Sequence, residues 1–313
     1  METQRQKVFV AVLSVLSNTT LIILKLIVGL IIGSVSVISE AIHSGVDLLA
    51  SIIALLAVKK SNQPADQDHS YGHGKYENLS GATEALLIFV AAAWIIYEAI
   101  HKLINPKPIE AVGWGVGVMF FSSVVNIFVS RLLFKVGKKT DSIALQADGW
   151  HLLTDVYTSA GVMVGLLILF FGEWFMPQLY WHWIDPVAAL GVALLIIKAA
   201  YQLTVKSISD LLDVSLPPEE EILVINKIKE MYPQVMGFHN FCSRKSGATR
   251  FVEFHLMLKA TISVQSSHAV SDKIEREIKS LFNDSKVMVH IEPCDDSCKN
   301  KCLTYCFVKY PPV

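Results

Sequence analysis

The chain has 313 residues, of which 52% are apolar and only 18% are charged, whereas about 25% of the residues in ordinary soluble domains are charged. This composition excludes a typical soluble protein. The formal net charge of −1 and the lack of a dense Lys/Arg run argue against nucleic acid as the main partner. Residues 1–206 contain 28 charged side chains and the much shorter segment 207–313 contains 27, so we expect a membrane domain followed by a soluble domain.

Six apolar stretches in the first part are each long enough to cross the hydrocarbon core of a bilayer as a helix. They lie at residues 8–32, 36–58, 79–104, 112–134, 142–171 and 182–205. The first stretch is too long for a signal-peptide core and no small-residue cleavage site follows it, so we expect it to be retained. Ten short-loop cations lie on one side of these spans and only Lys102 and Lys107 on the other, which predicts cytoplasmic N- and C-termini.

Two of the predicted spans carry the same motif, His-x3-Asp. His43 and Asp47 lie in the second span, and His151 and Asp155 lie in the fifth. A spacing of four residues places both side chains of a pair on one helix face, where they can chelate one ion. Both pairs fall near the middle of the membrane, at about 1.5 Å of rise per residue. Interhelical hydrogen bonding without a metal is the alternative, but ionisable residues inside a membrane mark transport pathways by default.

The composition of this set predicts its chemistry. Two imidazoles and two carboxylates form an N₂O₂ set that suits tetrahedral Zn²⁺. Two Asp anions and two neutral His balance one divalent cation, whereas an empty site leaves two negative charges in a low-dielectric setting. We therefore expect protons to enter as the metal leaves, which amounts to proton-for-metal exchange.

The hydrophilic loop after the second span contains a shorter ligand run, formed by Asp66, His69 and His73. The pattern Asp-x2-His-x3-His offers oxygen and nitrogen ligands on one cytoplasmic loop. From these residues alone, a solvated loop with ordinary histidines is the alternative.

After Lys206 the pattern becomes that of a small soluble domain. Pro217 and Pro218, followed by three glutamates, indicate a helix start. We predict helix 218–231, strand 236–243, a turn at 246–247, strand 249–259, helix 265–282 and strand 286–292. The predicted fold is thus an α-helical membrane protein with six transmembrane helices, plus a C-terminal cytoplasmic α/β domain of α-β-β-α-β order and ferredoxin/metallochaperone-like class.

Histidines mark the predicted sheet of this domain. His239 and His255 lie on successive strands, and His290 and Glu292 are two residues apart and so share one face of the third strand. His268 opens the second helix. The alternative to a metal site is a set of polar surface histidines on a half-exposed sheet.

Four of the five cysteines form an unbroken C-x3-C-x3-C-x3-C series at the end of the chain, at Cys294, Cys298, Cys302 and Cys306. A cytoplasmic location keeps thiols reduced, which argues against a disulfide framework. Spacing of four aligns the sulfurs along one helix, but zinc ribbons normally use two-residue gaps. Metal capture and a disordered or packing tail both remain open.

These motifs resemble one family. Paired His-x3-Asp motifs on the second and fifth of six spans resemble the cation diffusion facilitator family, and the loop 64–77 is similar to that of its bacterial zinc-efflux members of the YiiP/FieF type. The resemblance extends to about Cys294. It implies a homodimeric antiporter in a bacterial inner membrane that exports Zn²⁺, or Cd²⁺ or Fe²⁺, from the cytoplasm in exchange for protons by alternating access. We divide the chain into a transmembrane domain (1–206), a metal-binding dimerisation domain (207–293) and a Cys-rich tail (294–313).

The resemblance also implies three sets of metal ligands. The transport site falls on His43, Asp47, His151 and Asp155, the loop site falls on Asp66, His69 and His73, and a binuclear zinc site at the dimer interface falls on His239, His255, His268, His290 and Glu292. Some bacterial relatives have Asp at the position of His43, so this set is more like that of the zinc-selective members. Glu292 stands where the relatives usually have Asp, which leaves the geometry of a bridging carboxylate open.

Two other classes of function compete with a carrier. An enzyme is not expected, because no span contains His-Glu-x2-His and the paired motifs leave no obvious general base. A membrane-anchored sensor, in which the soluble domain binds metal without transport, is the alternative to a carrier.

Overall fold

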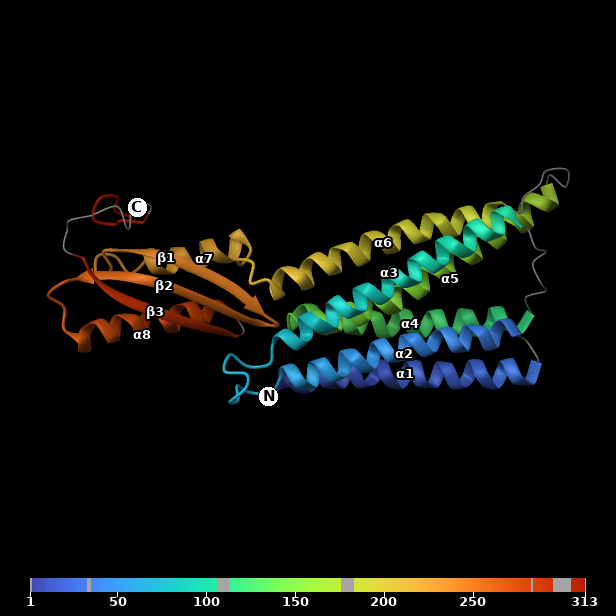
Figure 1. The fold of residues 1–313 in the computed structure, drawn as a ribbon, viewed down its shortest axis with the longest axis horizontal. Coiled ribbons are helices and arrows are strands. Elements are labelled where there is room, and N and C mark those ends of the chain that lie inside the picture. Colours follow the sequence, from blue (N-terminus) through green and yellow to red (C-terminus); the bar gives the residue numbers. More distant parts are fainter. Residues whose placement is uncertain are drawn as a thin grey trace. The chain divides into compact units, whose positions relative to one another are not determined.

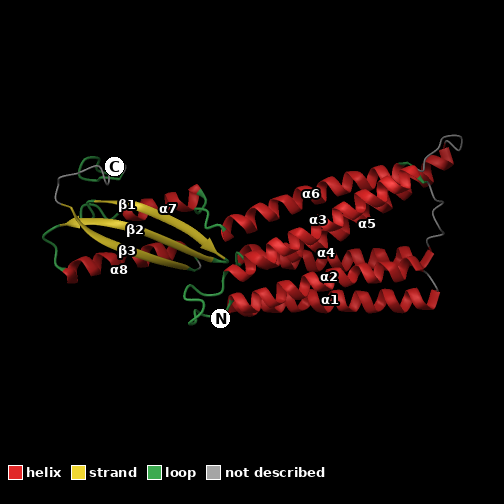
Figure 2. Cartoon of the chain, viewed as in Figure 1, coloured by secondary structure: helices red, strands yellow, loops and turns green. Residues whose placement is uncertain are grey.

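A computed structural model describes residues 2–32, 35–105, 113–175, 183–282, 284–294 and 305–312, although some side chains inside the helices lie outside the description. The chain divides into two compact units, residues 1–208 and 209–313. Within the described ranges, the first unit is entirely helical and the second combines helices with one sheet (Figure 2).

Six long helices form the first unit (Figure 1). They are α1 (Glu2–Ile32), α2 (Val35–Ser61), α3 (Lys75–Ile104), α4 (Gly113–Lys139), α5 (Ile143–Phe175) and α6 (Ile184–Leu211). Within the described residues, α1, α3, α4 and α6 are long and apolar enough to cross a membrane. The remaining two, α2 and α5, have 27 and 33 residues, more than the roughly 20 that a span needs, and they carry the His-x3-Asp motifs. The predicted helical membrane domain is confirmed.

Helix α5 lies at the centre of this unit, in contact with α2, α3 and α4. One apolar cluster joins it to α1, α2 and α4 through residues such as Ala11, Ala57 and Leu133. Another joins it to α3 and α6 through Ala85 and Ala200. Small residues at these contacts let the helix backbones approach closely, so side chains of α5 reach neighbours on several helices.

The second unit has the predicted α-β-β-α-β order. Its elements are α7 (Pro218–Lys229), β1 (Gly237–Ser246), β2 (Thr249–Lys259), α8 (Val264–Leu281) and β3 (Ser285–Cys294). The strand order is β1-β2-β3, with an antiparallel β1/β2 hairpin and a parallel β2/β3 pair that α8 connects. This arrangement confirms the predicted small α/β domain.

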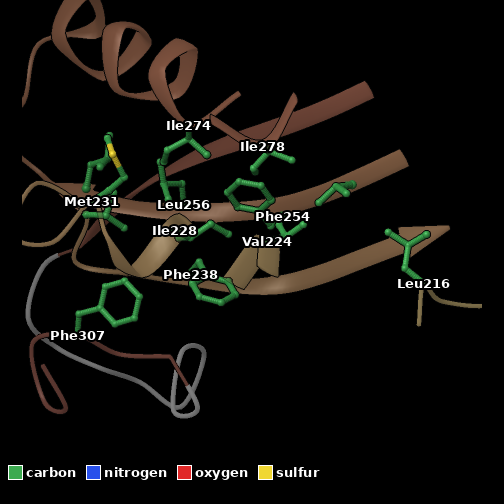
Figure 3. Close-up of a cluster of buried hydrophobic side chains, with 13 residues drawn as sticks. Leu216, Val224, Ile228, Met231, Phe238, Phe254, Leu256, Ile274, Ile278 and Phe307 are labelled. Atoms are coloured by element: carbon green, nitrogen blue, oxygen red, sulfur yellow. The ribbon is translucent and has the colours of Figure 1, made fainter. Parts of the chain in front are cut away.

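The core of this unit lies between the sheet and both helices (Figure 3). Phe254 and Leu256 of β2 point into it, with Ile228 of α7 and Ile274 of α8 on the other side. Because successive strand residues point to opposite faces, the residues that alternate with this core set, including His255, lie on the face that neither helix covers. That open face carries the histidines of the sheet.

The end of the chain packs against the edge of β1. Cys306 forms an antiparallel bridge with Gly237, the Phe307 N–H donates to the Met236 carbonyl at 2.9 Å, and the Tyr305 ring stacks on Phe238 at 4.3 Å. Phe307 is only 2% exposed. A Cβ on Gly237 would lie 2.5 Å from the Tyr305 carbonyl oxygen, so glycine is required for this approach.

Two of the four cysteines of the C-terminal series lie in the described structure. Cys306 is buried in the docked segment and Cys294 ends β3, whereas Cys298 and Cys302 lie outside the described residues. Residues 305–307 therefore serve as a packing segment, and nothing in the described residues tests metal capture by the series.

We expect Phe307→Ala to destabilise the second unit by about 3 kcal/mol or more, because it removes a buried aromatic ring from the core. Thermal unfolding of the purified full chain measures this effect. Val308→Ala is the matched control, since Val308 is exposed. Equal unfolding temperatures for both variants would show that the segment adds nothing to the core.

Candidate functional site

Two ionisable side chains from the paired motifs meet inside the helical unit. Nε2 of His151 on α5 lies 3.1 Å from Oδ1 of Asp47 on α2, and the residues are 4% and 6% exposed, respectively. Asp155 lies one turn beyond His151 on α5, half-buried, and His43 lies one turn before Asp47 on α2. The His43 side chain lies outside the description. The structure thus brings one residue of each motif into direct contact.

Polar side chains outside the predicted ligand set lie near this pair. Asn18 of α1 donates to the Asp47 carbonyl at 3.5 Å and to Ser51 Oγ at 2.7 Å. Lys25, also on α1, donates to Ser44 Oγ at 2.7 Å, one turn from Asp47. The signal was present as Ser14, Asn18 and Lys25, which recur near helical spacing in an otherwise apolar stretch.

A buried ion pair fixes the ends of the same helices. Lys7 Nζ of α1 lies 3.0 Å from Glu77 Oε1 of α3, and Ser61 of α2 donates to the same oxygen at 2.9 Å. Ser142, next to the start of α5, donates to the other oxygen of Glu77. One carboxylate with its hydrogen bonds satisfied therefore ties α1, α2 and α3 to the start of α5.

The loop after α2 gathers its three predicted ligands. Ligand atoms of Asp66, His69 and His73 all lie within 4.8 Å of one another. Nε2 of His73 lies 3.2 Å from Oδ2 of Asp66, and the two histidine rings are 4.3 Å apart. Nδ1 of His73 lies 3.2 Å from the Pro64 carbonyl oxygen, which fixes the ring with Nε2 toward the cluster.

The donor set of this loop fits a zinc ion. A hydrogen bond from the backbone N–H of His69 holds the pKa of Asp66 below its ordinary value, so the carboxylate is ionised at neutral pH. Two imidazoles and one carboxylate are a common three-ligand zinc set, with a fourth position left for water or another ligand.

The open face of the sheet carries a row of histidines. His239, His255 and His290 are directly opposite one another across β1, β2 and β3. The ring centroids are 5.0 Å apart for His239 and His255, and 4.6 Å apart for His255 and His290. The row results from the register of the three strands, which could not be predicted from the sequence.

Glu292 lies beside the row and approaches each histidine. Its carboxylate oxygens lie 3.2 Å from His239 Nε2, 2.8 Å from His255 Nδ1 and 3.8 Å from His290 Nε2. Partial burial raises the pKa of Glu292, but the hydrogen bonds with His255 and His239 outweigh it, and the pKa lies below its ordinary value. An ionised carboxylate among imidazoles is a donor set that fits Zn²⁺. The distances show that the Glu292 side chain reaches the histidines.

His268 lies elsewhere in the described structure. It is on α8, its side chain is 75% exposed, and its Nε2 lies 3.6 Å from Asp272 Oδ2. A single chain does not bring it into the cluster of Glu292, and its place in a binuclear site stays a prediction.

Comparisons with known proteins agree on one family. The family model of the cation efflux transmembrane domain matches residues 11–212, and that of the cation efflux protein cytoplasmic domain matches residues 217–294. The chain is 35% identical to the uncharacterized transporter sll1263 of Synechocystis, over 91% of this chain and 90% of the relative. It is 32% identical to the cation-efflux pump FieF of Salmonella paratyphi A, over 88% of this chain and 89% of the relative. A solved structure of the putative zinc transporter CzrB in its zinc form is 28% identical, with a TM-score of 0.26. The match covers 27% of this chain and 96% of the CzrB chain.

We expect His255→Ala to reduce the rise in unfolding temperature that Zn²⁺ produces in the full chain, since binding to the native state stabilises it by mass action. Zinc bound per subunit should fall in the same sample. Glu253→Gln is the control, because Glu253 is exposed on the same strand, two residues away. An unchanged zinc content in the His255 variant would show that His255 is not a ligand.

Proposed function

The chain belongs to the cation diffusion facilitator (cation efflux) family, and from this membership we propose that it exports Zn²⁺ from the cytoplasm in exchange for protons. It is an integral membrane protein of a family of transporters. The contact between Asp47 and His151 is the observation that carries the proposal. A carboxylate and an imidazole from different membrane helices face each other there, away from water.

Four side chains hold the transported ion in this proposal, His43, Asp47, His151 and Asp155. They supply two nitrogens and two oxygens, which suit tetrahedral Zn²⁺ better than the harder Mn²⁺. The nitrogen of His43 disfavours iron and manganese relative to an Asp at that position. Fe²⁺ is therefore a weaker substrate than Zn²⁺.

Charge balance couples the ion to protons. One divalent cation neutralises Asp47 and Asp155 while both histidines stay neutral. After the ion leaves, two uncompensated carboxylates in a low-dielectric bundle are costly. Protons that bind the emptied site remove this cost, so return of the carrier to the cytoplasmic side carries protons inward.

The other two clusters bind resident zinc in this proposal. The loop ligands Asp66, His69 and His73 hold one ion near the membrane domain. The row of histidines with Glu292 holds zinc on the open face of the sheet, where a second copy of the chain docks, and His268 completes the site in the homodimer. The match to the cytoplasmic domain of the family supports this arrangement.

The location follows from charge and from the relatives. Ten short-loop cations against two support a cytoplasmic location for both termini. FieF of Salmonella is a bacterial cation-efflux pump, and we propose the inner membrane of a bacterium for this chain. A metal sensor without transport remains the rival, and zinc flux separates the two functions.

We expect Asp47→Ala to abolish Zn²⁺ uptake into proteoliposomes under an imposed pH gradient, because the remaining ligands cannot balance the charge of the ion or complete its shell. Asp155→Ala should behave alike. Glu98→Gln, an exposed carboxylate on α3, should transport normally. Flux like that of the wild type in either Asp variant would contradict the assignment of the site, and no flux in the wild-type protein would favour the sensor.

We expect His43→Asp to broaden the range of ions toward Mn²⁺ and Fe²⁺, since a harder oxygen replaces a nitrogen. Competition of each ion against Zn²⁺ in the same flux assay measures the change. An unchanged selectivity ratio would argue that His43 does not contact the ion.

A further inference from the structure

Two buried carboxylates between α3 and α5 have no part in the site described above. Glu84 of α3 and Asp148 of α5 are both 0% exposed. They interact electrostatically with each other. The two helices pack closely around these acids. Gly81 of α3 packs against Ile143 of α5 near the start of both helices. About one turn later, Ala85 and Ala147 belong to the same apolar cluster. Glu84 and Asp148 adjoin these two alanines, so they lie at the same depth.

Each carboxylate uses only one oxygen in a hydrogen bond. Ser80 donates to Glu84 Oε1 at 3.0 Å and Ser51 donates to Asp148 Oδ1 at 2.8 Å. Within the described residues, Glu84 Oε2 and Asp148 Oδ2 are buried without a hydrogen-bond partner. Buried oxygens without a hydrogen-bond partner are costly, and a proton or a bound cation removes that cost.

Another buried carboxylate of the same unit, that of Glu77, has a structural role and offers a comparison. Glu77 is also buried, but it is paired with the Lys7 ammonium at 3.0 Å and accepts from two serines. In the described part of the chain, no ion pair with a basic side chain joins Glu84 or Asp148. Two neighbouring buried acids with no Lys or Arg partner form a place for an exogenous cation, although the His151 imidazole also interacts with Asp148.

A third polar group points to the same junction. Oγ of Ser207 on α6 is buried without a hydrogen-bond partner among the described residues. It lies 2.6 Å from the position of a Cβ on Gly81, one turn before Glu84. An unused hydroxyl therefore lies beside α3, about one helical turn from Glu84 along the chain.

The pair is also connected to the transport site. Asp148 precedes His151 by three residues, about one helical turn. Ser51, which donates to Asp148, accepts from Asn18, and Asn18 donates to the Asp47 carbonyl. Asp148 and the backbone of Asp47 thus belong to one continuous hydrogen-bond network.

We propose that Glu84 and Asp148 form an inner binding site for a divalent cation, one turn to the cytoplasmic side of the Asp47–His151 pair, which the cargo occupies between the cytoplasm and the transport site. This inference rests on the proposed function, because it takes from it that Zn²⁺ moves outward from the cytoplasm. Two carboxylates neutralise one dication. Their all-oxygen donor set holds Zn²⁺ less tightly than the site with imidazoles, and a waypoint has to bind weakly enough to release the ion onward.

Zinc counting and zinc flux on the same preparations test the site, with Zn²⁺ alone as the probe. Glu84→Gln and Asp148→Asn should each bind one zinc ion fewer per subunit at saturation in equilibrium dialysis. The zinc concentration for half-maximal flux should rise at least tenfold. Glu84→Asp keeps the carboxylate and should restore both values toward those of the wild type, and Glu98→Gln, exposed on the same helix, should change neither.

Two results would overturn the inner site. One is the wild-type zinc count in both the Gln and Asn variants. The other is a fall in maximal flux at every zinc concentration with an unchanged zinc count, which would mean that the acids act without holding the ion. Absence of flux in the wild-type protein would contradict the proposed function instead, and the zinc count would still decide the inner site.

Discussion

A carboxylate and an imidazole that face each other among apolar helices impose the main constraint on this protein. Removing Asp47 and His151 from water is costly unless each finds a partner, and each is the hydrogen-bond partner of the other. The contact places α2 against α5, and α5 in turn packs on α3 and α4. The pair is therefore a structural contact and a pair of candidate ligands, and a bound cation has to replace one hydrogen bond by two coordinate bonds.

The rest of the helical unit is built around that requirement. Alanines at the contacts of α5 bring the helix backbones close together. The Lys7–Glu77 pair ties the ends of the helices with every charge compensated. Between this tie and the Asp47–His151 pair, Glu84 and Asp148 are buried, and among the described residues neither forms an ion pair with Lys or Arg. The paired carboxylate of Glu77 is therefore a structural group, whereas the carboxylates of Glu84 and Asp148 can bind an ion.

Much of this architecture could be predicted from the sequence. Six apolar stretches gave six helices, and the α-β-β-α-β order of the soluble unit followed from alternating strands and a proline-initiated helix. Local patterns decide such elements. The spacing of Asp66, His69 and His73 likewise predicted a cluster, because a short loop keeps its own residues close together.

Other features depend on contacts between distant residues, which no local pattern contains. The docking of Phe307 on β1 depends on the space that Gly237 leaves. The row of His239, His255 and His290 depends on strand register, and a bulge after His239 shifts the register of β1. The burial of Glu84 depends on how α3 packs on α5. His268 is exposed on α8 in the single chain, although the family resemblance groups it with the sheet histidines.

Anomalous scattering at the zinc absorption edge, from crystals of the full chain grown with Zn²⁺, tests the central claim most directly. The account predicts a zinc peak in contact with both Asp47 and His151, at about 2.0–2.2 Å from each ligand atom, in place of their direct hydrogen bond. A zinc-saturated crystal with peaks at the loop and the sheet, but with the Asp47–His151 hydrogen bond intact and no peak beside it, would contradict the account.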